Sequence, residues 1–252
     1  QQADRILYFF DMHDREGTDR PFELPDAVNE QIATLAAVNP NVIVIASSGT
    51  AFGMPWLEQV KGLVHCYYLG QERGSALANV LSGAVTPSGK LPFSMEQSFS
   101  DSPAYGYNVL DDEVVWDQND TPSGKRLRGQ VVDVPYKEGV FVGYRGYEAK
   151  KTPLHFPFGF GLSYTAFSIS DVKLSASEIS KDAPVTVSVT VTNTGKTRGA
   201  EVVQLYVHED NPMVERPYRE LKAFQKVMLE PGESKTVALS IDWKSLAFWE
   251  VN

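Results

Sequence analysis

The chain has 252 residues, of which 42% are hydrophobic and 22% charged, and its formal net charge is −9 at pH 7. This length suffices for one large domain or two ordinary ones, and the composition is that of a globular protein rather than a disordered one. The acidic balance argues against nucleic acid or anionic lipid as a partner, and no apolar run reaches the roughly twenty residues of a membrane-spanning helix.

The chain opens at Gln1 without an initiator Met or a signal peptide, which indicates a piece of something longer. Its single cysteine, Cys66, lies in an apolar run and is interpreted as a buried, unreactive thiol. No Cys/His cluster has the spacing of a zinc site, and no phosphate-binding glycine loop or dinucleotide fingerprint occurs. We therefore predict neither a metal nor a cofactor.

The first ninety residues alternate between strand-like and helix-like segments. Buried strands are predicted at 6–10, 42–45 and 63–68, and helices between Pro25 and Asn39 and over 71–82. Continuous apolar runs such as Ile6–Phe10 are typical of strands covered on both faces. The order of these elements predicts a parallel, doubly wound sheet. Three strands are few for this class, so part of the sheet is expected to lie outside this sequence.

The rest of the chain changes character twice. Residues 96–162 are rich in Gly, Pro and Tyr without clear periodicity, which favours a connection between domains. From about Ser163 the hydrophobic period becomes two, with valines alternating over 185–191, and this predicts an antiparallel β-sandwich. The predicted domains are 1–95, 96–162 and 163–252, the last of them truncated.

Candidate chemistry lies in the loops that follow the predicted parallel strands. Ligands of such sheets bind beyond the carboxyl ends of the strands. The loops at 11–20, 47–56 and 70–74 leave these ends. Sequence order therefore predicts that Glu16, Ser48 and Glu72 lie along one rim.

Each candidate has a plainer interpretation. Most loop glutamates such as Glu16 are simply solvated. Asp19 and Arg20 are more often a local ion pair or loop brace than a clamp on a substrate. Trp56 can stack on a sugar ring or pack in the core, and Glu72 at a helix start can offset the helix dipole.

A serine esterase is disfavoured. Ser48 is not surrounded by a Gly-x-Ser-x-Gly elbow. The histidines have no obvious catalytic partner and are interpreted as structural: His13, His65, His155 and His208.

Several segments, in this order, resemble motifs of family 3 of the glycoside hydrolases, the β-glucosidase and β-xylosidase family. Thr18, Leu69 and Arg73 depart from the family pattern. The segments are Glu16-Gly17-Thr18-Asp19-Arg20, Met54-Pro55-Trp56, Leu69-Gly70-Gln71-Glu72, Pro87-Ser88-Gly89-Lys90-Leu91-Pro92, Tyr136-Lys137-Glu138-Gly139, Val142-Gly143-Tyr144-Arg145, Pro157–Tyr164, Arg216–Lys222 and Pro231-Gly232-Glu233.

The resemblance implies part of an α/β sandwich domain with a parallel sheet, followed by an all-β fibronectin type III-like sandwich. It also implies a retaining mechanism in which Glu16 is the general acid/base, with Glu72 as second choice. Trp56, Asp19 and Arg20 are the implied substrate contacts. The family's Asp nucleophile lies on an N-terminal barrel that this sequence lacks, so the chain by itself is predicted to be inactive.

The expected substrate is an oligosaccharide or aryl β-glycoside, cleaved at its terminal non-reducing sugar. A β-glucosidase is favoured, while xylose, arabinose and N-acetylglucosamine stay open. The alternative is a non-catalytic carbohydrate-binding or scaffold segment derived from such an enzyme. Family habit favours a periplasmic or secreted location.

Overall fold

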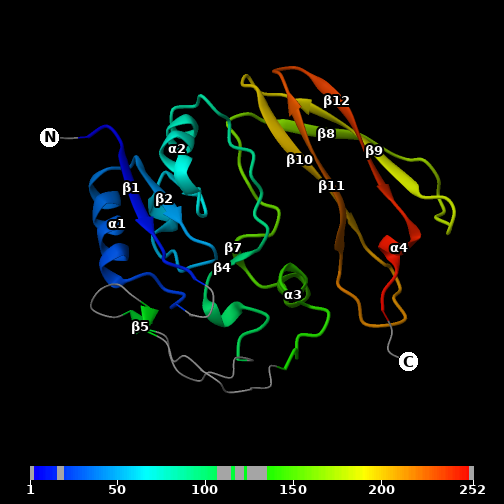
Figure 1. Cartoon of the computed structure of the whole chain (residues 1–252), viewed down its shortest axis with the longest axis horizontal. Coiled ribbons are helices and arrows are strands. Elements are labelled where there is room, and N and C mark those ends of the chain that lie inside the picture. Colours follow the sequence, from blue (N-terminus) through cyan, green and yellow to red (C-terminus); the bar gives the residue numbers. More distant parts are fainter. Residues whose placement is uncertain (1–2, 16–19, 107–114, 117–121, 124–134, 250–252) are drawn as a thin grey trace. The chain divides into compact units, whose positions relative to one another are not determined.

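The computed structural model describes residues 3–15, 20–106, 115–116, 122–123 and 135–249. They form two compact units that are interleaved along the chain (Figure 1). Unit 1 contains residues 1–74 and 94–157, and unit 2 contains residues 75–93 and 158–252. Residues 75–93, which belong to the first predicted domain, are thus part of unit 2.

Unit 1 is built on a parallel sheet with the strand order β1-β2-β3. The strands are β1 (Ile6–Asp11), β2 (Val42–Ser47) and β3 (Gly62–His65). Ile6 lies opposite Val42, and Val44 lies opposite Leu63. The central strand is buried on both faces, as its continuous apolar run predicts. The predicted parallel sheet is therefore confirmed.

The edge strand β1 differs from this prediction. Its residues alternate between half-buried and exposed, and Leu7 and Phe9 are 45% and 48% exposed. Side chains of successive strand residues point to opposite faces, so the exposed residues share one face of β1. The apolar run Ile6–Phe10 predicts that both faces of β1 are buried. Among the described residues, only one face of β1 is covered.

The helices of the first ninety residues lie close to their predicted positions. Helix α1 (Asp26–Val38) packs against β2 and buries Ile32. A 3₁₀ turn, η2 (Gly70–Glu72), leads into α2 (Arg73–Leu81). Strand β3 ends at His65, before its predicted end, because Tyr67 has φ of +49° and leaves the extended conformation. Within the described ranges, no helix has the length and apolarity to cross a bilayer.

In the described parts of the predicted connection, the elements are short. They are η1 (Leu57–Gln59) before it, then β4 (Met95–Glu96), η3 (Phe99–Asp101), β5 (Val115–Trp116), β6 (Pro122–Ser123), α3 (Tyr144–Lys150) and β7 (Leu154–Phe156). Strands β4 and β7 pair with each other although they lie far apart in sequence. The sequence shows no period here because elements this short cannot display one.

Unit 2 contains an antiparallel sandwich, as the period of two predicts. Its strands are β8 (Phe167–Leu174), β9 (Val185–Asn193), β10 (Gly199–Val207), β11 (Glu220–Leu229) and β12 (Ser234–Ile241), followed by the short α4 (Trp243–Leu246). One sheet has the order β12-β9-β8 and the other pairs β10 with β11. Their inner residues form one core: Val189, Val191, Val203, Val227, Leu229, Val237 and Leu239.

Two glycine-containing turns meet inside unit 2. The Lys90 ammonium donates to the Gly161 carbonyl at 2.8 Å and pairs with the Glu201 carboxylate at 2.8 Å. The Leu91 amide donates to the Phe160 carbonyl, also at 2.8 Å. These bonds join the Pro87–Pro92 turn to the segment that enters the sandwich. They explain why residues 75–93 belong to unit 2.

We expect Gly161→Ala to destabilise unit 2 strongly. A Cβ atom at Gly161 would lie 2.0 Å from the Gly89 carbonyl oxygen, so the backbone must move. A loss of about 2–4 kcal/mol in the free energy of unfolding is expected, measured by urea denaturation. Gly89→Ala is the matched control, because a Cβ atom there meets nothing within 4 Å. Equal losses in the two variants would contradict this contact.

Candidate functional site

The loops after the three parallel strands meet at one rim. The Met12 amide donates to the Ser47 carbonyl at 2.8 Å, and the Ser47 hydroxyl donates to the Tyr67 carbonyl at 2.7 Å. The Tyr68 hydroxyl donates to the Met12 carbonyl and accepts from the Asp14 amide. Parallel pairing brings the carboxyl ends of the strands to one edge, and these bonds then join the loops.

The centre of the rim is an ion pair between Asp14 and Arg20. The side chains of Arg20 and Asp14 are only 8% and 17% exposed. The guanidinium also donates to the Ser48 hydroxyl at 3.2 Å, the Ala51 carbonyl at 2.9 Å, the Pro21 carbonyl at 2.8 Å and the Thr50 hydroxyl. The planar guanidinium presents its donors in a fixed fork, which suits several acceptors at once. We call this pair with its acceptors the rim clamp.

Asp14 is held in its charged form. Burial by itself would raise the pKa of Asp14, but the Gly49 amide and the Arg20 guanidinium lower it below its usual value. The Gly49 amide donates to the carboxylate at 2.6 Å. Hydrogen bonds and a nearby cation stabilise the charged form of a carboxyl group. Asp14 is therefore an acceptor at neutral pH, not a proton donor.

The predicted catalytic residue Glu16 and the predicted substrate contact Asp19 lie outside the described residues. Their neighbours in sequence are described: Asp14 and Arg20 both belong to the rim clamp. The structure thus brings together the two ends of the segment that carries Glu16. Asp14 and Tyr68 were missed in the sequence because a single Asp or Tyr in a polar loop has no pattern that sets it apart.

Arg20 was predicted as a substrate contact, with a loop brace as the plainer interpretation. Its guanidinium donates to five protein acceptors and is almost fully buried. This arrangement favours the brace, since few donors are left for a ligand.

Trp56 lies in the core of unit 1, where it is 1% exposed. Its indole N–H donates to the Asn29 amide oxygen of α1 at 2.9 Å. A ring that stacks on a sugar must expose one face. The burial of Trp56 favours core packing, and no exposed face supports the predicted stacking.

The other two rim candidates, Ser48 and Glu72, have weaker support as catalytic residues. Ser48 is fully buried, and its hydroxyl donates to the Thr50 carbonyl at 2.7 Å rather than to a histidine. Glu72 is exposed in the 3₁₀ turn before α2. Beside it in sequence, Arg73 pairs with Asp11 at 2.9 Å, half in solvent. Across the described ranges, no three His, Cys, Asp or Glu side chains gather as a metal site.

His65 lies at the end of β3 among aromatic rings. Phe52 stacks on its imidazole with ring centroids 6.2 Å apart, and Tyr67 meets it edge-on at 4.4 Å. Burial lowers the pKa of His65 to about 4. The ring is therefore neutral at physiological pH, which agrees with the structural role predicted for it.

We expect His65 to make the protein less stable in mild acid. The unfolded chain binds a proton at this ring near pH 6.5, but the folded chain binds it only near pH 4. Stability is thus complete above pH 6.5 and falls as the pH decreases toward 4, by up to about 3 kcal/mol. His65→Phe should keep the ring contacts and reduce this slope in urea denaturation between pH 4 and 7. An unchanged slope would contradict the prediction.

Known protein families and sequences are similar to this chain. Residues 1–144 match the family model "Glycosyl hydrolase family 3 C-terminal domain", and residues 201–252 match a fibronectin type III-like domain. The chain is 42% identical over 238 residues to beta-glucosidase BoGH3A of Bacteroides ovatus, covering 94% of this chain and 30% of that protein. It is 40% identical over 240 residues to thermostable beta-glucosidase B of Acetivibrio thermocellus, covering 95% and 29%.

Solved structures give the same result. The fold is similar to that of the Bifidobacterium adolescentis GH3 beta-glucosidase, with a TM-score of 0.84, 35% identity and coverage of 99% of this chain and 34% of that one. It is also similar to beta-glucosidase 3B from Thermotoga neapolitana in complex with glucose, with a TM-score of 0.78, 31% identity and coverage of 97% and 33%. The chain spans about a third of the length of these relatives.

Proposed function

Because this chain belongs to glycosyl hydrolase family 3, we propose that it is part of a retaining, exo-acting β-glucosidase and that Glu16 supplies the general acid/base. One observation carries this proposal. The rim clamp joins Arg20, the last residue of the segment that resembles the family's acid/base motif, to Asp14, which precedes that segment, at the carboxyl edge of a parallel sheet. In the sequence, Glu16 is the second residue after the clamped Asp14.

In the proposed reaction, Glu16 first protonates the glycosidic oxygen as the bond to the sugar breaks. The nucleophile Asp takes the sugar as a covalent intermediate, and Glu16 then removes a proton from the attacking water. A retaining enzyme needs its two carboxyl groups about 5–5.5 Å apart. The rim clamp supports this proposal, because its ion pair holds Asp14 and Arg20, described residues on either side of 16–19.

The nucleophile is proposed to come from a barrel domain, on the same gene product or on a companion chain. The relatives are about three times as long as this chain, which supports a further domain. The exposed face of β1, with Leu7 and Phe9, supports it as well, since apolar surface of this kind is usually covered.

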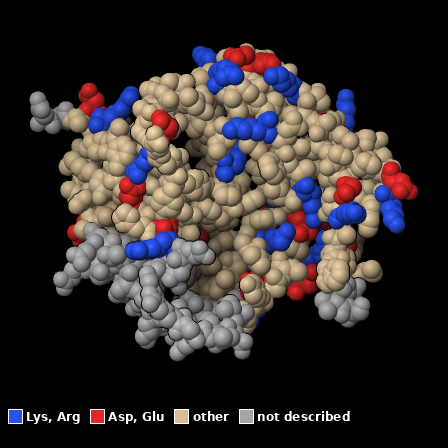
Figure 2. Space-filling view, viewed as in Figure 1, with Lys and Arg blue, Asp and Glu red and all other residues tan. Residues whose placement is uncertain are grey.

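The proposed substrate is an oligosaccharide or aryl β-glycoside with a terminal non-reducing glucose. The relatives are named beta-glucosidases, and one similar structure holds glucose. Nucleic acid and membrane surfaces are not proposed as partners, because the net charge is −9; on the face drawn in Figure 2, acidic and basic side chains are interspersed. A periplasmic or secreted location is proposed on the habit of the family alone.

We expect the 252-residue chain by itself to hydrolyse no aryl β-glucoside, because the proposed nucleophile is outside it. Release of 4-nitrophenol from 4-nitrophenyl β-glucoside should match the rate without protein. A form that includes the barrel should release 4-nitrophenol from the same substrate faster than the rate without protein. Turnover by the verified 252-residue chain would show that both carboxylates lie within it, and would overturn this division of the site.

A further inference from the structure

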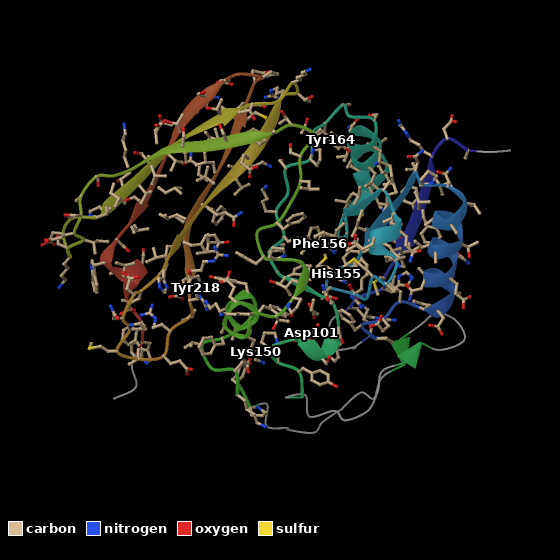
Figure 3. All side chains as sticks on the ribbon, turned by 180° about the vertical axis from the view of Figure 1, so that it is seen from behind. Asp101, Lys150, His155, Phe156, Tyr164 and Tyr218 are labelled. Atoms are coloured by element: carbon tan, nitrogen blue, oxygen red, sulfur yellow. The ribbon has the colours of Figure 1, made fainter. Side chains whose placement is uncertain are left out.

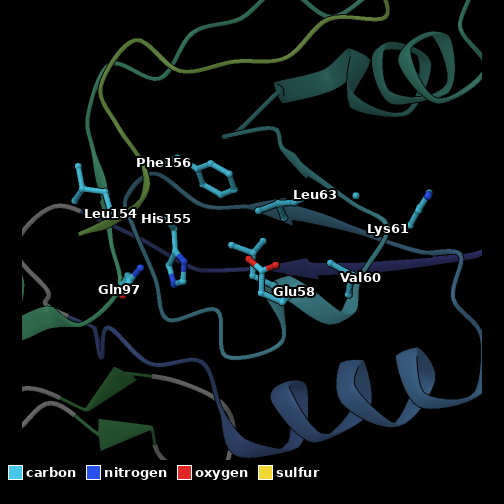
Figure 4. A pocket seen from close by; sticks show the side chains of 10 residues that line it. Glu58, Val60, Lys61, Leu63, Gln97, Leu154, His155 and Phe156 are labelled. Carbon is cyan, nitrogen blue, oxygen red and sulfur yellow. The ribbon is translucent and has the colours of Figure 1, made fainter. Parts of the chain in front are cut away.

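A polar hollow lies in unit 1, at the end of the sheet opposite to the rim. Its volume is about 330 Å³, and it is bordered by η1, the start of β3 and β7 (Figure 4). This volume is within the range of small-molecule sites. The hollow borders the amino end of β3, at Gly62 and Leu63, whereas the rim loops follow the carboxyl ends of the strands.

The side chains around the hollow combine hydrogen-bonding groups with apolar surface. His155 and Phe156 come from β7 and lie next to each other in Figure 3. Glu58 comes from η1, and Figure 4 shows its carboxylate beside the His155 imidazole. Gln97 adds an amide, and Leu63 adds apolar surface. Donors, acceptors and an apolar face thus border one space.

The charges of these groups restrict the ligand. Burial lowers the pKa of His155, although the nearby Glu58 carboxylate opposes this, so the imidazole is neutral at pH 7 and offers one donor and one acceptor. The lining residues include one cation, Lys61, and one anion, Glu58, so their formal charges sum to zero. A phosphate would face the Glu58 carboxylate, and the described residues gather no metal site. A neutral molecule rich in hydroxyl groups fits this balance.

We propose that this hollow binds a single neutral sugar ring. The hydroxyl groups of the sugar would bond to Glu58, His155 and Gln97, and its apolar C–H face would lie on Leu63. The hollow and its neutral, polar character rest on the residues themselves. The choice of a sugar among neutral polyols rests on the proposed glycosidase function.

The test is a titration of the protein at its full natural length with D-glucose, followed by NMR of ¹⁵N-labelled histidine rings. His155→Gln identifies the His155 signals by their loss. We expect these signals to shift saturably with glucose, and we expect glycerol, which lacks a ring, to shift them less. Glu58→Gln should weaken glucose binding at this site about 10-fold, since it removes a charged acceptor. Gln59→Ala is the matched control, because Gln59 is an exposed neighbour in the same turn that does not border the hollow.

Two results would overturn this proposal. One is the absence of a saturable shift at His155, and the other is equal glucose binding by Glu58→Gln and Gln59→Ala. Glucose is a product of the proposed reaction, so the titration involves no turnover. Failure of the proposed function would instead appear as undiminished hydrolysis by Glu16→Gln, a result that leaves the titration at His155 unaffected.

Discussion

Glu16→Gln should reduce the hydrolysis of alkyl and 4-nitrophenyl β-glucosides by about 10²–10⁴-fold in the full-length protein. The amide introduced by this substitution cannot donate a proton to the departing oxygen, nor can it accept one from water. The loss should be largest for the alkyl glucoside, whose leaving group needs a proton, and smaller for 2,4-dinitrophenyl β-glucoside, whose leaving group does not. The measurement is kcat and KM for the three substrates.

Glu72→Gln is the matched control for this prediction. Glu72 is the other carboxylate weighed for the role, and it lies exposed in the turn before α2. Its replacement should change kcat less than about twofold, as for most surface substitutions. If Glu16→Gln binds sugar but does not turn it over, the chain is part of an enzyme. Unchanged turnover would remove Glu16 from the mechanism and favour a non-catalytic carbohydrate-binding segment.

Arg20→Leu should cost about 3 kcal/mol of the free energy of unfolding and lower kcat about 10–100-fold. The substitution leaves the Asp14 carboxylate without its cation in a site where the two side chains are 17% and 8% exposed. It also removes the hydrogen bonds that Arg20 donates to the Ser48 and Thr50 hydroxyls and to the Ala51 carbonyl. Arg20→Lys should recover less than half of the lost stability, because one ammonium cannot reproduce the fork. Urea denaturation and steady-state kinetics measure both effects.

Arg73→Leu is the matched control for the rim clamp. The Arg73–Asp11 pair lies on the same rim, but its side chains are 36% and 40% exposed. Solvent screens such a pair, so its loss should cost less than about 1 kcal/mol. The measurements on Arg20→Leu also distinguish the two roles of Arg20. Loss of a brace lowers stability and kcat together, whereas loss of a substrate contact raises KM and leaves stability unchanged. The second pattern in Arg20→Leu would contradict the brace.

Much of the fold could be predicted because its elements are long and periodic. The valines of β9 alternate with polar residues, and their burial alternates in the same way. The run at β2 is apolar throughout, and that strand is buried on both faces. The short elements between 94 and 157 were missed, since pairs such as β4 with β7 depend on residues far apart in sequence.

The rim was predicted in outline but not in its chemistry. The order of the strands is enough to place the loops after β1, β2 and β3 at one edge, because parallel strands align their carboxyl ends. The separation of residues 75–93 into unit 2 was not predictable, since it rests on contacts such as that between Lys90 and Glu201. Periodicity predicts which face of a helix or strand is buried. It does not predict which other element packs against that face.

The amino-acid sequence was enough to predict the family, the parallel sheet, the sandwich and Glu16 as the acid/base candidate. These depend on local pattern and on motif order, which a linear chain carries in full. The tertiary structure alone decided that Asp14 and Arg20 form a buried clamp and that Trp56 lies in the core. The reason is physical: whether Arg20 or Trp56 meets solvent, a sugar or another side chain is set by the atoms that surround it, and these come from distant positions.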